Sequence, residues 1–119
     1  MHGRRLLGLT ERHPDHQVFI DAIDSATLVV VEFFSKADGR MLVRACAPMD
    51  YAPPSRGRDR SHRYHFWDYE SGGLLPPHPL SMLADQIRRM SPTSDRFDPG
   101  DFVTWPPRWS YPREWGRFS

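Results

Sequence analysis

Near the N-terminus the apolar residues recur with the period of a helix. Pro14 and Asp15 stand at the start of this stretch, where proline suits the first turn and an acidic side chain complements the helix dipole. The apolar side chains that follow share one helical face; they are Val18, Phe19, Ala22, Ile23 and Ala26. The pattern predicts an amphipathic helix over residues 15–25.

The pattern then changes to β-branched and aromatic residues. Residues 27–35 are nearly apolar on both faces, as in a strand that is covered on both sides. Ala37-Asp38-Gly39 supplies a turn, and residues 40–49 follow as a returning strand that Pro48 ends. We therefore expect a β-hairpin.

A third strand is expected over residues 62–69, between the loop 53–60 and the turn Ser71-Gly72-Gly73. With a period of two, Tyr64 and Phe66 share one face, and the other face carries His65, Trp67 and Tyr69. One face belongs to the core. The other face either stacks bases or covers another protein, or it too is buried under the helix and the tail.

Length and composition predict one β-rich domain. The chain of 119 residues is long enough for one compact domain, and its twelve prolines and eight glycines favour many turns. We expect an N-terminal arm (1–14), a domain (15–104) and a C-terminal tail (105–119). Cys46 is the single cysteine and is expected as a buried apolar residue. The absence of a long apolar run predicts a soluble, cytoplasmic protein without a membrane segment.

Five short motifs occur in the order found in WYL domains, which are known mostly from bacterial regulators. They are Ala22-Ile23, Val29-Val31-Phe33 at alternate positions, Arg44-Cys46-Pro48 likewise, Asp85-Gln86-Ile87 and Phe97-Asp98-Pro99. The chain resembles this family over residues 17–103. The resemblance implies a mainly β (α+β) fold, with an N-terminal helix followed by a small five-stranded Sm/SH3-like barrel. It also implies a non-enzymatic module that senses a ligand or binds nucleic acid.

The chain departs from the family at two places. The Trp-Tyr-Leu triad is replaced by Arg63-Tyr64-His65 or by Tyr64-His65-Phe66, and the second arginine of the family's ligand pocket is Gln86 here. By resemblance, Arg44 takes the place of the pocket's central arginine, which would hold an anionic group. The family's usual DNA-reading domain is not represented, so the resemblance implies a stand-alone module.

Two alternatives stand for the stretch Leu80–Met90. Its apolar residues are spaced by three, four and three positions, which is typical of a helix. The resemblance instead favours a strand, a tight turn near Asp85 and a second strand.

Charge is concentrated rather than large. The net charge is +1, so the whole molecule is no obvious polyanion binder. Four arginines lie within residues 56–63, with Asp59 as the only acid. They form either a phosphate-tracking surface beside aromatic platforms or a solvated loop. The predicted binding residues for single-stranded nucleic acid or a small anionic ligand are Arg44, Arg56, Arg58, Arg60, Arg63, Tyr64, His65, Trp67 and Tyr69.

The tail holds Trp105, Trp109 and Trp115, each of which could bury ~150–250 Å². Either the tail folds back over the domain, or it meets a partner chain, which gives the alternative function of a protein-interaction or homo-oligomerisation module without nucleic acid. No phosphate-binding loop or nucleophile elbow is present. His62 and His65 would point to opposite faces of a strand and could not share an ion. We expect no enzyme activity, metal or cofactor.

Overall fold

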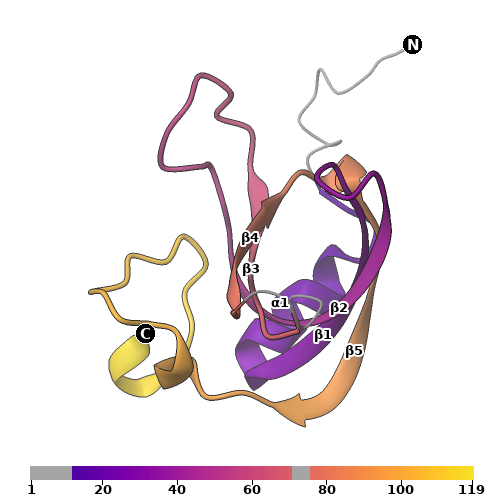
Figure 1. The fold of residues 1–119 in the computed structure, drawn as a ribbon. Coiled ribbons are helices and arrows are strands. Elements are labelled where there is room, and N and C mark those ends of the chain that lie inside the picture. Colours follow the sequence, from indigo (N-terminus) through magenta and orange to yellow (C-terminus); the bar gives the residue numbers. More distant parts are fainter. Residues whose placement is uncertain (1–11, 71–75) are drawn as a thin grey trace.

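The computed structural model describes residues 12–70 and 76–119, and in them an α-helix precedes a five-stranded antiparallel sheet (Figure 1). The elements are α1 (His16–Ser25), β1 (Thr27–Ser35), β2 (Arg40–Ala52), β3 (Arg63–Asp68), β4 (His78–Met82) and β5 (Ile87–Arg96). Short 3-10 helices span Ala84–Gln86, Pro99–Asp101 and Gly116–Phe118. Residues 1–11 of the predicted N-terminal arm and the predicted Ser71-Gly72-Gly73 turn lie outside the described residues.

The strands are ordered β4-β3-β2-β1-β5, and each is antiparallel to its neighbour. The predicted helix, hairpin and mainly β fold are confirmed. The predicted five-stranded Sm/SH3-like barrel is not closed: β4 pairs with β3 and β5 with β1, and no ladder joins β4 to β5 in the described segments. The sheet is curved but keeps two edges (Figure 1).

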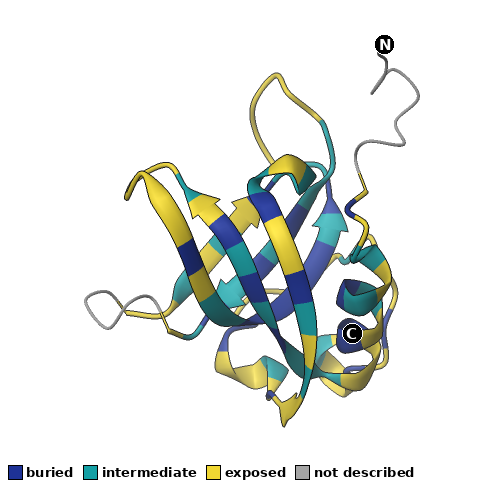
Figure 2. Cartoon of the chain, turned by 90° about the vertical axis from the view of Figure 1, so that its right-hand side faces the viewer, coloured by how far each residue is buried: buried dark blue, intermediate teal, exposed yellow. Residues whose placement is uncertain are grey.

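The core lies between α1 and one face of the sheet, here called the inner face. Val29, Val31 and Phe33 of β1 line this face, and α1 adds Phe19 and Ile23. Figure 2 shows buried residues alternating with more exposed ones along the strands, as expected for a sheet covered mainly on one side. The opposite face is called the outer face below.

Tyr64 and Phe66 of β3 share one face, as predicted; it is the inner face, and both are fully buried. The ring of Phe19 meets each of them edge to face, at centroid distances of 5.0 Å and 5.3 Å. Such contacts contribute beyond the burial of apolar area. These contacts pack α1 against the inner face of β3.

The stretch Leu80–Met90 forms a strand, a turn and a strand, so the helical alternative is wrong. Ile87 and Met90 both face the core although they are three positions apart. A register shift between Glu32 and Phe33 of β1 allows this, since Phe33 pairs with Ile87 and Val31 with Met90. A β-bulge places an extra residue on one strand, and here it produces a spacing that resembles a helix.

β2 continues through Pro48 to Ala52, which corrects the prediction that Pro48 ends the strand. Proline cannot donate to a ladder and is tolerated at bulges. Pro48 pairs with Phe66, and the register shifts between Pro48 and Asp50, which pairs with His65. The bulge places Asp50 on the outer face together with His65.

The tail folds back onto the domain. Trp115 is 7% exposed and its Nε1 donates to the carbonyl of Ile23, in α1, at 2.9 Å. The Arg113 guanidinium lies 4.1 Å from the ring centre of Trp109 and 4.4 Å from that of Trp115. Of the three tail tryptophans, Trp105 is the exposed one, at 43%.

Asp50 and Arg113 fasten the tail to β2. Arg113 donates to the carbonyl of Met49 and reaches the Asp50 carboxylate at 3.4 Å. Burial lowers the pKa of Arg113 to about 10, and the negative charge of Asp50 opposes that shift. Arg113 therefore carries its charge at neutral pH, inside the fold.

Arg113→Ala should lower the free energy of unfolding by about 3 kcal/mol or more, because it leaves Asp50 as an uncompensated buried charge. Chemical denaturation followed by tryptophan fluorescence measures this. Arg117→Ala, at an exposed tail position, is the matched control, and its change should stay below about 1 kcal/mol. Equal effects of the two substitutions would mean that the tail is not held by this pair.

Candidate nucleic-acid interface

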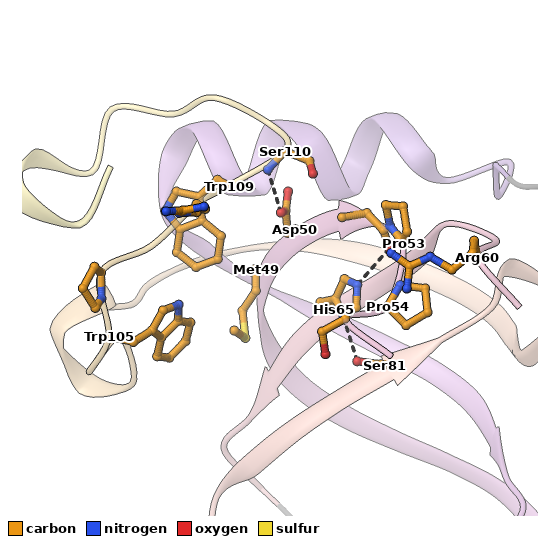
Figure 3. A pocket seen from close by; sticks show the side chains of 14 residues that line it. Met49, Asp50, Pro53, Pro54, Arg60, His65, Ser81, Trp105, Trp109 and Ser110 are labelled. Atoms are coloured by element: carbon orange, nitrogen blue, oxygen red, sulfur yellow. Dashed lines mark hydrogen bonds between the residues drawn. The ribbon is translucent and has the colours of Figure 1, made fainter. Parts of the chain in front are cut away.

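A groove of about 690 Å³ lies on the outer face, where the loop after β2 meets the tail (Figure 3). It combines two features that the sequence presents separately, the arginine-rich loop and the tryptophan-rich tail. The lining residues are Met49, Asp50, Ala52, Pro53, Pro54, Ser55, Arg60, His65, Ser81, Trp105, Pro106, Arg108, Trp109 and Ser110.

Aromatic and proline rings form the sides of the groove. Figure 3 places Trp105 and Trp109 on one side and Pro53 and Pro54 on the other, with Met49 between them. The two indole rings meet edge to face at 6.1 Å. The exposed ring of Trp105 is therefore held by Trp109 and offers a platform for stacking.

His65 forms part of the floor with a defined tautomer. Its Nε2 lies 2.9 Å from the carbonyl oxygen of Ala52, and its Nδ1 lies 2.7 Å from Oγ of Ser81 (Figure 3). A carbonyl oxygen only accepts, so Nε2 of His65 donates, and in the neutral ring Nδ1 accepts from the Ser81 hydroxyl. Both nitrogens are thus engaged, and the ring contributes its surface to the groove.

The groove has an excess of positive charge. Within residues 12–70 and 76–119, the one carboxylate in its lining is that of Asp50, whose oxygens accept the backbone N–H groups of Ser110 at 2.8 Å and Tyr111 at 3.0 Å and face Arg113. The charge of Asp50 is therefore compensated. Arg60 and Arg108 are exposed at the groove, so its polar edge favours an anion.

The other loop arginines differ in their surroundings. Arg56 and Arg58 are exposed in the same loop as Arg60, close in sequence to the groove but not part of its lining. Arg63 starts β3 and pairs with Asp59 at 3.6 Å. Its Nε is buried and has no hydrogen-bond partner among the described residues.

Three predicted aromatic residues lie outside the groove. Tyr64 is fully buried in the core, so it cannot stack a base. Trp67 stacks on Phe102 with a centroid distance of 5.6 Å, and the Tyr69 hydroxyl donates to Asp101 at 3.0 Å. The segment after β5 thus partly covers the outer face of β3, as in the predicted alternative in which this face is buried.

Arg44 lies on the opposite face of the sheet from the groove. It pairs across the ladder with Val31, which faces the core, and residues paired in this way share a face. Its Nε is 4.0 Å from the Asp68 carboxylate. The predicted single site is therefore two places, the outer groove and an inner-face cluster around Arg44.

Gln86, which replaces the second pocket arginine of the family, closes the turn between β4 and β5. Its Oε1 accepts the backbone N–H of Leu83 at 3.1 Å. The side chain is used to shape the turn.

Some groove residues were not predicted from the sequence. The position of Arg108 between two prolines and Trp109 could have indicated a binding residue in the tail. Met49 and Ser81 lie in no distinctive local pattern. Asp50 and Arg113 are single charges 63 residues apart. Their pairing depends on the fold-back of the tail.

No group of three or more histidine, cysteine, aspartate or glutamate side chains is gathered for metal binding within residues 12–70 and 76–119. In the same part of the chain, no helix has the length and apolarity that crossing a bilayer requires.

Neither the models of known protein families nor the curated proteins contain a match to this chain. Among solved structures, proteasome accessory factor B/C (PafBC) of Arthrobacter aurescens is similar, with a TM-score of 0.55 and 12% sequence identity. The match covers 93% of this chain and 16% of that protein, so the chain spans only a small part of its length. At this identity the similarity shows the fold alone, and that fold is WYL-like.

Cys46 lies two positions after Arg44 on the inner face of β2 and is fully buried. Burial raises the pKa of the Cys46 thiol well above its ordinary value, and the negative charges of Asp68 and Glu70 raise it further. Because the thiolate is the reactive form, iodoacetamide at pH 8 should alkylate the folded protein at least about a hundredfold more slowly than the protein in guanidinium. Mass spectrometry measures both rates. Similar rates would show that Cys46 is not enclosed as described.

Proposed function

We propose that this chain is a regulatory module of WYL-like fold that binds single-stranded nucleic acid along the outer groove. One observation carries the proposal: the fold brings the arginine-rich loop and the exposed Trp105 to the two sides of one groove (Figure 3). Nonspecific single-strand binding needs a cationic path for the phosphates and aromatic rings for the bases.

The residues divide between these two tasks. Arg60 and Arg108 would contact phosphates from the groove, and Arg56 and Arg58 would extend the positive charge along the loop. Trp105 would stack a base. His65 would support the strand by ring contact, because its nitrogens are engaged with Ala52 and Ser81.

The regulatory part of the proposal is supported by the likeness to a protein named as an accessory factor. The binding part rests on the groove alone. We propose no catalytic step, and the compensated Asp50 is assigned the role of holding the tail.

Arg44 defines a second candidate place for an anionic ligand, on the inner face beside Asp68. A ligand there would compete with the Asp68 carboxylate for the guanidinium. A ligand in the groove would not compete with Asp50 for Arg60 and Arg108, because the Asp50 carboxylate already faces Arg113. We therefore place the strand in the groove.

The alternative function is association with another chain through the tail. Trp109 and Trp115 are packed within the domain, so Trp105 is the tail tryptophan on which this alternative depends. Sedimentation velocity at increasing protein concentration, without nucleic acid, separates the two functions. Self-association that Trp105→Ala abolishes would favour the alternative.

Trp105→Ala should weaken binding of a labelled single-stranded oligonucleotide about tenfold, because one stacked base contributes about 1–3 kcal/mol. Arg60→Gln should lower the slope of log K against log salt by about 0.7, the value for one phosphate contact on a single strand. Fluorescence anisotropy over a salt series measures both. Arg96→Gln, exposed on β5, is the charge-matched control and should bind like the unmodified protein.

Two results would contradict the groove. Binding that does not change with salt would exclude phosphate contacts by the loop. Loss of binding in Arg44→Gln, with Trp105→Ala unaffected and both proteins folded by circular dichroism, would place the strand on the inner face.

A further inference from the structure

A second pocket of about 370 Å³ lies on the other side of the strap formed by residues 109–113, and Ser110 lines both hollows. This pocket is built at the start of α1 and the end of β2. Its lining residues are Arg12, His16, Gln17, Ile20, Tyr51, His62, Ser110 and Tyr111. The volume falls in the range of about 300–1,000 Å³ that is usual for small-ligand sites.

The tautomer of His16 follows from the buried hydroxyl of Tyr64. That oxygen accepts the backbone N–H of His13 at 2.8 Å and lies 2.8 Å from Nδ1 of His16. Its proton is therefore available to His16, whose Nδ1 accepts it. In the neutral ring the proton of His16 is then on Nε2, a donor whose place is fixed by the core.

His16 remains neutral near pH 7. Partial burial lowers its pKa below the ordinary value of 6.5, and the positive charge of Arg12 lowers it further. Arg12 itself is exposed and lines the pocket. The pocket thus has a neutral N–H donor and a guanidinium close to each other.

Among the described residues, no carboxylate lines this pocket. The nearby acids of α1 are engaged at its margin, since Asp21 accepts the Gln17 amide at 2.8 Å and Asp24 accepts the Tyr111 hydroxyl at 2.9 Å. The pocket therefore presents donors with no competing anion in its lining, a composition that suits an acceptor-bearing or anionic ligand.

The walls are aromatic. Tyr51 lies against His62 with a centroid distance of 4.9 Å and meets His16 edge to face at the same distance. Tyr111 adds a third ring from the strap. Such walls favour a flat ring over a flexible aliphatic chain.

We propose that this pocket binds a small planar aromatic ligand that carries an anionic group, with the ring against Tyr51 and the anion at Arg12. His16 would donate from Nε2 to an acceptor of the ligand. A nucleoside monophosphate and an aromatic carboxylate share this chemistry. The site is distinct from the groove and does not require strand binding there.

Isothermal titration of the full chain with AMP and with benzoate tests the proposal and separates the two sources. Inorganic phosphate and adenosine are the partial ligands. At least one of AMP and benzoate should bind. If AMP binds more tightly than benzoate, the affinities of phosphate and adenosine should each be about tenfold lower than that of AMP, or too low to measure. Binding of phosphate as tight as that of AMP would overturn the role of the aromatic walls.

Arg12→Gln should weaken binding of the aromatic anion about tenfold, because a charge-assisted hydrogen bond is lost. Arg40→Gln changes the net charge equally at the far end of β2 and should leave the affinity unaltered. His16→Phe should weaken binding as well; because it also removes the partner of Tyr64, the exposed Arg12 position provides the readout that does not depend on the core. Equal affinities of Arg12→Gln and Arg40→Gln would refute the site.

The test of this pocket and the test of the groove have different outcomes. Oligonucleotide binding without binding of AMP or benzoate would refute this pocket and leave the groove in place. Binding of AMP or benzoate without oligonucleotide binding would do the reverse.

Discussion

The carboxylate of Asp50 connects the sheet to the tail, and both candidate sites depend on it. It lies on the outer face of β2, just after the bulge at Pro48, where it accepts the backbone N–H groups of Ser110 and Tyr111 and faces Arg113. Burying two charges is costly, and the cost is recovered only when geometry and further hydrogen bonds are good. Here the backbone donors and the two tryptophan rings around Arg113 provide those contacts.

The strap of residues 109–113, held in this way, separates the two hollows of the molecular surface. On one side lies the groove with Trp105 and Arg60, and on the other the pocket with His16 and Arg12. The charge balance of the groove follows from the same contact, because Arg113 compensates the charge of Asp50, so this lining carboxylate does not neutralise Arg60 and Arg108. The pair of Asp50 and Arg113 thus holds the strap between the two hollows and leaves the groove with a positive edge.

A second network links the core to the surface. The Tyr64 hydroxyl would be an unsatisfied polar group in the core without partners, and it is bonded to the backbone of His13 and to His16. Tyr64, which was predicted to stack a base, instead orients the ring of His16 through its buried hydroxyl. Similarly, Gln86 closes a turn, where the family resemblance suggested a pocket arginine.

Elements with a local signal could be predicted from the amino-acid sequence alone. The apolar stripe of α1, the β-branched run of β1 and the alternation of β3 each predict an element and its buried face, because side-chain period follows directly from backbone geometry. The β-bulges in β5 and β2 described above were not predictable in this way. They shift the register by one residue, so Ile87 and Met90 share a face and β2 passes through Pro48. Which charged groups and rings come into contact depends on the folding of the whole chain. Arg44 and the arginines of the loop lie on opposite faces of the sheet, whereas Trp105 and Arg60 line the same groove. The groove depends on the pairing of Asp50 with Arg113, which are 63 residues apart. A contact at this separation leaves no periodic pattern in the sequence from which it could be predicted.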